Sequence, residues 1–233
     1  SIDTTEAPIT KNSATGSALL PVASVSLTTV QNNYRALQSF AKTAETSAVV
    51  KADCYGHGMP QVASALYDIG CRTFFVAYLH EGIELRKLLG ADPRVFVFNG
   101  IQHDLIPVCN SISQVEFCVS NKYSKTYSIH FDTGMNRLGI RRENWERVIS
   151  HAKTKAPELI LSHLACGDIA DHPMNVSQLK QFESLVEFFP DSQKSFANTA
   201  GTYLGPEYHF DLIRPVFMEV GRRVHRKYGS KQP

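Results

Sequence analysis

The sequence lacks a continuous apolar run long enough to cross a membrane, and it also lacks a marked excess of charge of either sign. Lysine and arginine number 24 against 22 aspartate and glutamate residues, and the net charge of +2 argues against a dedicated nucleic-acid surface. We therefore expect neither a membrane nor a nucleic acid as partner. A hydrophobic fraction of 43% over 233 residues suffices instead for one large domain, of the size of an α/β barrel.

Cysteine is scarce, and its pattern excludes two common kinds of site. The sequence has no CxxC motif and no cluster of histidine and cysteine with the spacing of metal ligands, so we expect no metal. An odd number of widely spaced cysteines, mostly within apolar segments, favours free buried thiols in a reducing, cytoplasmic compartment. The five are Cys54, Cys71, Cys109, Cys118 and Cys166.

The two ends of the sequence differ in composition from the middle. Residues 1–20 are rich in serine and threonine and lack the apolar core of a secretory signal, which predicts a flexible tail. Residues 217–233 are basic and almost without apolar periodicity, so we expect a second tail, with the closing helix of the fold missing or replaced. The folded domain is thus expected at 21–216.

Apolar segments in the middle alternate between strand-like runs and helical periodicity. Strands are expected at 47–50, 73–78, 94–99, 115–120, 127–132, 159–165, 194–197 and 210–214, with a separate one at 21–27. Helices are expected at 28–44, 59–69, 80–89, 143–155 and 176–189, with a weaker one near 101–109. This alternation predicts an α/β fold, a parallel sheet closed as a (β/α)8 TIM-like barrel. We expect it to be incomplete, because only about half a dozen polar residues separate the fourth and fifth strands.

Lys51 lies where the buried strand at 47–50 ends and the connection to the helix at 59–69 begins. Ligands bind at this edge of a parallel α/β fold, and a desolvated ammonium there can lose its proton and become an amine nucleophile. That chemistry is the formation of a Schiff base. The alternative is a surface lysine beside a glycine-rich turn, because a lysine followed four residues later by Tyr55 is a weak signal by itself.

Two later strands end in residues with functional side chains. Arg137 lies in the segment 132–140 after the fifth strand, where its planar guanidinium can bind a phenolate oxygen or a carboxylate. His163 ends the sixth strand, next to apolar neighbours. The alternatives are a solvated or structural arginine and a hydrogen-bonded core histidine.

The last two strands end in a loop and an arginine. Asn198 and Thr199 lie in a loop of small residues typical of the phosphate sites that barrels build after strands seven and eight. Arg214 ends the eighth strand, and an arginine can donate a hydrogen bond to a ring nitrogen without giving up its proton. The alternatives are an ordinary barrel loop and a structural ion pair between Arg214 and Asp211.

Residues 51–58 (KADCYGHG) and 132–140 (DTGMNRLGI) closely resemble the motifs of the alanine racemases, pyridoxal-phosphate enzymes of fold type III. The resemblance extends over roughly 21–215 and implies pyridoxal 5'-phosphate attached to Lys51, which is then also the catalytic residue. It assigns the cofactor site to Lys51, Tyr55, Arg137, His163, Asn198, Thr199 and Arg214.

The resemblance also implies a role for each of these side chains. Arg137 contacts the phenolic oxygen of the cofactor and the substrate carboxylate, and His163 packs against the pyridine ring. The hydroxyl group of Thr199 binds the phosphate, and Arg214 contacts the ring nitrogen. Other positions that fit the pattern are Asp168, Gln178 and Phe182. Two positions depart from it: His130, where many members have a lysine, and Val216, where the family has a glycine.

The implied reaction is the interconversion of L- and D-alanine by a homodimer, which supplies D-alanine for peptidoglycan precursors. The resemblance covers only the N-terminal barrel, and the family's C-terminal β-domain, with the tyrosine that is the second acid/base, has no counterpart here. We therefore expect a truncated racemase with impaired or no full racemisation and without a secure dimer. The alternatives are a non-catalytic pyridoxal-phosphate carrier of one domain and a phosphate-binding barrel without cofactor, which leaves Lys51 unexplained.

Overall fold

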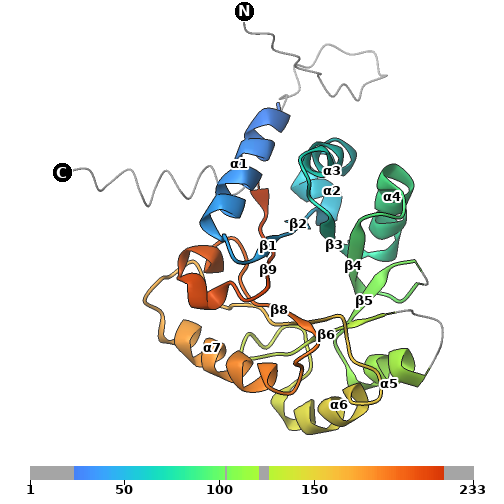
Figure 1. The fold of residues 1–233 in the computed structure, drawn as a ribbon, viewed down its shortest axis with the longest axis vertical. Helices are drawn as coiled ribbons and strands as arrows, with labels where there is room; N and C mark the ends of the chain where they lie inside the picture. Colours follow the sequence, from blue (N-terminus) through green and yellow to red (C-terminus); the bar gives the residue numbers. More distant parts are fainter. Residues whose placement is uncertain (1–23, 103, 121–125, 218–233) are drawn as a thin grey trace, which may run out of the picture.

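The computed structural model describes residues 24–102, 104–120 and 126–217, in which parallel strands are surrounded by helices (Figure 1). Seven strands form one sheet in chain order, and every neighbouring pair is parallel. The strands are β2 (Ala48–Val49), β3 (Thr73–Tyr78), β4 (Arg94–Asn99), β5 (Ile106–Cys109), β6 (Ser128–His130), β7 (Leu159–Leu161) and β8 (Gln193–Ser195).

Two further short strands connect the edges of this sheet. β1 (Glu45–Thr46) pairs in parallel with β9 (Leu212–Ile213), and β1 runs through one residue into β2. On the other side of β9, the backbone N–H of Asp211 donates to the Lys194 carbonyl at 3.1 Å and that of Arg214 to the Ala197 carbonyl at 2.9 Å. The strands therefore form an α/β TIM-like barrel, which confirms the fold expected from the sequence.

Helices cover the outside of the strands (Figure 1). They are α1 (Leu27–Phe40), α3 (Met59–Asp68), α4 (Leu79–Leu89), α5 (Ile112–Ser120), α6 (Trp145–Ala152) and α7 (Pro173–Val186). The helical layer is incomplete, because the described residues between β4 and β5 contain no helix and those between β8 and β9 contain only the 3-10 turns η2 (Gly201–Tyr203) and η3 (Pro206–Tyr208). Within the described ranges no helix is both long and apolar enough to span a bilayer.

The strand expected at 21–27 is wrong in the part that the structure describes. Residues 24–26 form no strand, and Ser26 is the N-cap of α1, where its hydroxyl oxygen accepts from the backbone N–H of Thr29 at 3.3 Å. Residues 21–23, the whole tail expected at 1–20 and the basic segment 218–233 lie outside the described residues. The domain boundaries at 21 and 216 therefore stay a prediction.

The strand expected at 115–120 and the weak helix expected near 101–109 are also wrong, because the two kinds of element are exchanged. Residues 115–120 belong to helix α5, and the segment 101–109, expected to be a weak helix, contains strand β5. The apolar residues of VEFCVS fit both periods, and the helix buries Val115 and Cys118 on one face while Phe117 stays exposed. The connection without a helix thus falls between β4 and β5, one step earlier than expected.

The core has two parts. Inside the barrel a cluster of apolar side chains fills the space between the strands, with Phe75 stacked on Phe96 at 4.7 Å between ring centroids. Between strands and helices lies a larger cluster that includes four of the five cysteines, all five of which are free, as expected. A filled interior leaves the ends of the barrel as the places for polar groups.

The amino-terminal end of the barrel is closed by the side chain of Arg94 from β4. Its guanidinium donates to Glu45 at 2.6 Å, to Glu158 at 3.0 Å and to Gln193 at 2.7 Å, and its Nε donates to Thr73 at 3.1 Å. Glu45, Thr73 and Gln193 belong to β1, β3 and β8, and Glu158 directly precedes β7. Arg94 therefore ties distant strands together at this end.

Replacing Arg94 by methionine is expected to lower the free energy of unfolding by about 1–3 kcal/mol, because two partly exposed carboxylates and several polar groups lose one shared partner. Urea unfolding followed by circular dichroism measures the difference. The matched control is Arg147→Met, which removes the more exposed ion pair with Glu116 and should lower it by only about 0–1 kcal/mol. Equal effects of the two substitutions would contradict a special role of Arg94.

Candidate functional site

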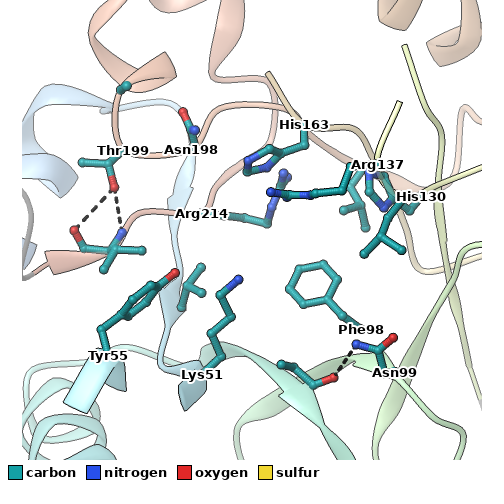
Figure 2. A pocket seen from close by; sticks show the side chains of 16 residues that line it. Lys51, Tyr55, Phe98, Asn99, His130, Arg137, His163, Asn198, Thr199 and Arg214 are labelled. Atoms are coloured by element: carbon teal, nitrogen blue, oxygen red, sulfur yellow. Dashed lines mark hydrogen bonds between the residues drawn. The ribbon is translucent and has the colours of Figure 1, made fainter. Parts of the chain in front are cut away.

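A cavity of about 480 Å³ lies at the carboxyl-terminal ends of the strands, the end at which barrels bind their ligands. All seven residues assigned to the site from the sequence line it (Figure 2). The complete lining is Val49, Lys51, Tyr55, Ala77, Phe98, Asn99, His130, Arg137, Leu138, Leu161, His163, Asn198, Thr199, Ala200, Arg214 and Val216.

The lining carries positive charge without a matching negative charge. It includes one lysine and two arginines, and none of its sixteen residues is an aspartate or glutamate. Low-dielectric walls with charges of one sign concentrate their field in the cavity and attract ligands of the opposite sign. The cavity is therefore built for an anionic ligand.

Lys51 starts an unusual turn at the end of β2. The element labelled α2 (Lys51–Gly56) is left-handed, with φ between 52° and 57° at the four residues 52–55. None of these four is a glycine, and the left-handed conformation costs about 1–2 kcal/mol for each such residue. The turn brings Tyr55 back toward Lys51, whose amino nitrogen lies 5.9 Å from the centre of the tyrosine ring.

Contacts with the surrounding chain hold this turn in place. The backbone N–H of Cys54 donates to the Val50 carbonyl at 3.0 Å, and the Cys54 side chain is buried in the core. The backbone N–H of Ala52 donates at 2.5 Å to the carboxylate of Glu81, which lies in the first turn of α4. The backbone N–H of Met59, where α3 begins, donates to Asp53 at 2.8 Å. The Glu81 side chain, 29 positions from Ala52, therefore contributes to the position of Lys51.

The environment of the Lys51 amine favours its neutral form. Burial lowers the pKa of Lys51 below the ordinary value of 10.5, and the positive charge of Arg137 lowers it further. The negative charge of Glu81 acts in the opposite direction but is the smaller effect. A larger share of Lys51 is thus an uncharged amine, able to act as nucleophile or base, than of an exposed lysine at the same pH.

Arg137 is carried by a loop that closes on itself. The carboxylate of Asp132 accepts from the backbone N–H of Gly134 at 3.0 Å and from that of Asn136 at 3.1 Å. Gly139 has a φ of +103°, and a Cβ there would lie 2.9 Å from the backbone nitrogen of Asp132. A side chain at position 139 would clash with this backbone, so glycine allows the loop to fold tightly, and Arg137 on the loop lines the cavity.

His163 lies on the loop after β7, which Gln178 from helix α7 holds at two points. The Gln178 amide donates to the His163 carbonyl at 3.0 Å and accepts from the backbone N–H of Ala165 at 2.9 Å. Burial, followed by the positive charge of Arg214, lowers the pKa of His163 well below its ordinary value of 6.5. The imidazole is therefore neutral at physiological pH.

The other two positions taken from the resemblance lie outside the cavity lining. Phe182 stacks on Phe196 with 5.1 Å between ring centroids and supports the strand end from behind, whereas Asp168 is exposed. Of the three further positions, Gln178 thus has the most direct connection to a residue of the cavity.

Arg214 is buried, with 4% of its surface exposed, at the end of β9. Its guanidinium donates to the Ser195 hydroxyl and to the Ser162 carbonyl, both at 2.5 Å. Burial lowers the pKa of Arg214 to about 9, which still leaves the side chain protonated at pH 7. The suggested pairing with Asp211 is not present, because the Asp211 carboxylate accepts instead from the backbone N–H of Lys194 at 2.9 Å.

Asn198 and Thr199 lie opposite Arg137 and His130 in the cavity (Figure 2). The Thr199 hydroxyl accepts from the backbone N–H of Val216 at 2.8 Å, and the Asn198 side chain accepts from the backbone N–H of Gly201 at 2.8 Å. Val216 is not among the described residues with a left-handed backbone, so a valine fits here without the freedom of glycine.

His130 lines the cavity but was noted in the sequence only as a departure from a pattern. Its Nδ1 lies 2.8 Å from the side-chain oxygen of Asn110, whose amide nitrogen donates to the carbonyls of Phe98 at 3.1 Å and Val108 at 3.0 Å. These bonds fix the amide orientation, so Nδ1 carries the proton and Nε2 is an acceptor. Burial, then Arg214, lowers the pKa of His130 to about 3, which keeps the ring neutral.

The remaining lining residues that sequence reasoning missed are mostly apolar or amide side chains at strand ends, such as Val49, Phe98, Asn99 and Leu161. Alternation along each strand was the available signal, because residues that point into the barrel come every second position. Most of the strands are too short for this alternation to show which inward-pointing residue lies at the strand end and lines the cavity.

The fold and the cavity together define a TIM-like barrel with a lysine-centred site for an anionic ligand. The family model for the alanine racemase N-terminal domain matches residues 25–218, and the chain belongs to this family. It is 39% identical over 208 residues to an alanine racemase of Rickettsia canadensis, covering 82% of this chain and 58% of that protein. A Rickettsia prowazekii alanine racemase is 42% identical over 207 residues, covering 82% and 51%. The chain thus spans about half the length of these curated relatives.

Solved structures agree with this assignment. The alanine racemase of Bartonella henselae, a structure with covalently bound pyridoxal phosphate, matches with a TM-score of 0.80 and 35% identity over 88% of this chain and 64% of that one. The Acinetobacter baumannii alanine racemase matches with a TM-score of 0.75 and 27% identity over 84% and 58%. A histidine racemase of Leuconostoc mesenteroides, at 22% identity and a TM-score of 0.70 over 81% and 54%, shares the fold.

Proposed function

We propose that this chain is the cofactor-binding barrel of an alanine racemase, in which Lys51 holds pyridoxal 5'-phosphate and acts on the α-proton of alanine. The observation that carries the proposal is a lysine with a lowered pKa in a cavity that has two arginines and no carboxylate in its lining. The residues fit the cofactor, since its phosphate and phenolic oxygen are anionic and its aldehyde reacts with an uncharged amine. Family membership supports the same assignment.

Different residues of the cavity lining suit different groups of the cofactor. Thr199 and Asn198 lie at one end with Tyr55 nearby, where hydroxyl and amide groups are able to hold the phosphate. His163 and Arg214 also line the cavity, where a neutral imidazole can pack on a pyridine ring and a protonated guanidinium can donate to its nitrogen. Arg137 remains for the phenolic oxygen and the substrate carboxylate.

Pyridoxal phosphate, when joined to an amino acid, draws electrons from the α-carbon and makes its proton removable. Lys51 is suited to take that proton, because its amine is partly uncharged in the cavity. His130 and His163 are poor bases at neutral pH, since the pKa of each is lowered far below 6.5. Arg214 keeps its own proton and so does not supply one to the ring nitrogen, which limits side reactions.

A non-catalytic carrier of pyridoxal phosphate is the alternative function. It requires the same cofactor contacts and differs only in that the α-proton of an amino acid is not moved. The matching family model and the two curated Rickettsia relatives, both alanine racemases, favour the racemase. A homodimer and a cytoplasmic location stay predictions.

The attachment of cofactor to Lys51 can be tested by trapping. Incubation of the protein with pyridoxal phosphate, followed by borohydride reduction and peptide mapping, is expected to place the label on Lys51, since this is the lysine that lines the cavity. Lys51→Ala serves as the control and should remain unlabelled. Label on a different lysine, or none, would refute the proposed function.

Thr199→Val is expected to weaken cofactor binding by about 1.5–3 kcal/mol, the contribution of a hydrogen bond to a charged group. The substitution removes a hydroxyl from the end of the cavity assigned to the phosphate and leaves the backbone N–H of Val216 without its acceptor. Fluorescence titration with pyridoxal phosphate measures the affinity. Thr154→Val, at an exposed position, is the control, and equal affinities of the two variants would place the phosphate elsewhere.

The third test concerns turnover. Racemisation needs one base on each face of the α-carbon, and among the lining residues Lys51 is the amine suited to serve one face. The chain alone is expected to exchange the α-hydrogen of one enantiomer with solvent deuterium, D-alanine by resemblance to the family, and to act on L-alanine about 10²–10⁴-fold more slowly. Proton NMR in deuterium oxide follows both. Rapid interconversion of both enantiomers would reveal a second base, and exchange of neither would favour the carrier.

A further inference from the structure

Glu81 is a buried carboxylate close to the cavity that the proposed chemistry does not use. It is 8% exposed, does not belong to the lining, and forms no ion pair with any residue in the described part of the chain. A buried carboxylate without a cation needs other groups to satisfy its charge. Its hydrogen-bond partners therefore indicate what it does.

The partners are three backbone N–H groups from two neighbouring strand ends. Oε2 accepts from Ala77 at 2.7 Å and from Tyr78 at 2.9 Å, which is the ordinary reach of a glutamate at the third position of a helix back to its N-cap. Oε1 accepts from Ala52 at 2.5 Å, which belongs to the turn after the adjacent strand β2. One carboxylate thus joins the start of α4 to the turn that carries Lys51.

Ala52 is where this contact has the largest effect on the turn. It is the first residue in the left-handed conformation, with a φ of 53°, and it directly follows Lys51. A left-handed alanine is unfavourable by about 1–2 kcal/mol, so the turn persists only where the surroundings hold it. A hydrogen bond to an ionised carboxylate is roughly twice as strong as one between neutral groups.

We propose that Glu81 is a positioning residue for Lys51, whose carboxylate holds the left-handed turn at Ala52 and thereby directs the Lys51 amine into the cavity. The proposal rests on the proposed function for the role of Lys51. Glu81 itself touches neither the cavity nor a ligand in it. The same carboxylate places a negative charge near the amine, which gives the proposal a second, electrostatic consequence.

The test compares Glu81→Gln and Glu81→Asp with the control Glu84→Gln, an exposed glutamate on the same helix. Glutamine has one acceptor oxygen and no charge, whereas aspartate keeps the charge but is too short to reach both strand ends. Pyridoxal-phosphate affinity is measured by fluorescence titration. The pH midpoint for acetylation of Lys51 by acetic anhydride, read by peptide mapping, is measured without cofactor.

Glu81→Gln is expected to weaken cofactor binding about tenfold or more and to move the acetylation midpoint to lower pH, because the stabilising negative charge is gone. Glu81→Asp should weaken binding similarly while its midpoint stays closer to that of the unaltered chain. Glu84→Gln should change neither quantity. If Glu81 only stabilised helix α4, its substitution would not shift the pH midpoint for acetylation of Lys51.

A rescue variant separates the turn from general loss of stability. Adding Ala52→Gly to each Glu81 variant supplies a residue that adopts the left-handed conformation without strain, and binding should recover at least about fivefold. Thermal unfolding of every variant records whether it is folded, and a Glu81→Gln chain that unfolds leaves the aspartate and double variants to decide.

Unchanged affinity and midpoint in both Glu81 variants, or no recovery with Ala52→Gly, would overturn the proposal. Failure of the unaltered chain to take up pyridoxal phosphate would overturn the proposed function instead. In that case the pH dependence of acetylation, measured without cofactor, would still show whether Glu81 affects the protonation of the Lys51 amine.

Discussion

The structure depends on keeping positive charges in a cavity that has no acidic side chain in its lining. Lys51, Arg137 and Arg214 gather at the carboxyl-terminal end of one barrel. Burial lowers the pKa of Lys51 and of Arg214, and the positive charge of Arg137 lowers that of Lys51 further. The chain does not relieve this by ion pairing. Arg214 is held by a serine hydroxyl and a carbonyl, both neutral acceptors, so its positive charge remains to act on a ligand.

The acidic residues near the cavity are used in a different way. Asp132 and Glu81 are both buried, and their carboxylates accept hydrogen bonds from backbone N–H groups. Each fixes a strained or tightly folded loop, and each loop carries a cation of the site: Arg137 in one case and Lys51 in the other. The negative charges thereby position the functional cations without neutralising them, which combines rigid geometry with an anion-attracting cavity.

This division explains which features the sequence could predict. The long apolar runs at 73–78 and 94–99 predict buried strands because no other element fits them, whereas 115–120 fits a strand and a helix equally well. The side chains of the cavity could be assigned because they follow strand ends and resemble known motifs. The left-handed turn at 52–55 could not, since alanine, cysteine and tyrosine have no preference for positive φ. Its contact with Glu81 joins residues 29 positions apart, and no local pattern encodes it.

The two ends of the barrel show the same side-chain type in opposite circumstances. At the amino-terminal end Arg94 forms ion pairs with Glu45 and Glu158 and also donates to Gln193 and Thr73, so carboxylates of the protein already balance its charge. At the other end Arg214 is more deeply buried, yet no carboxylate within the described ranges pairs with it. A buried cation without a counter-charge lowers the stability of the free barrel, and an anion that binds beside it offsets that loss. Ligand affinity and fold stability are therefore linked through Arg214, whereas the stability contributed by Arg94 is independent of the ligand.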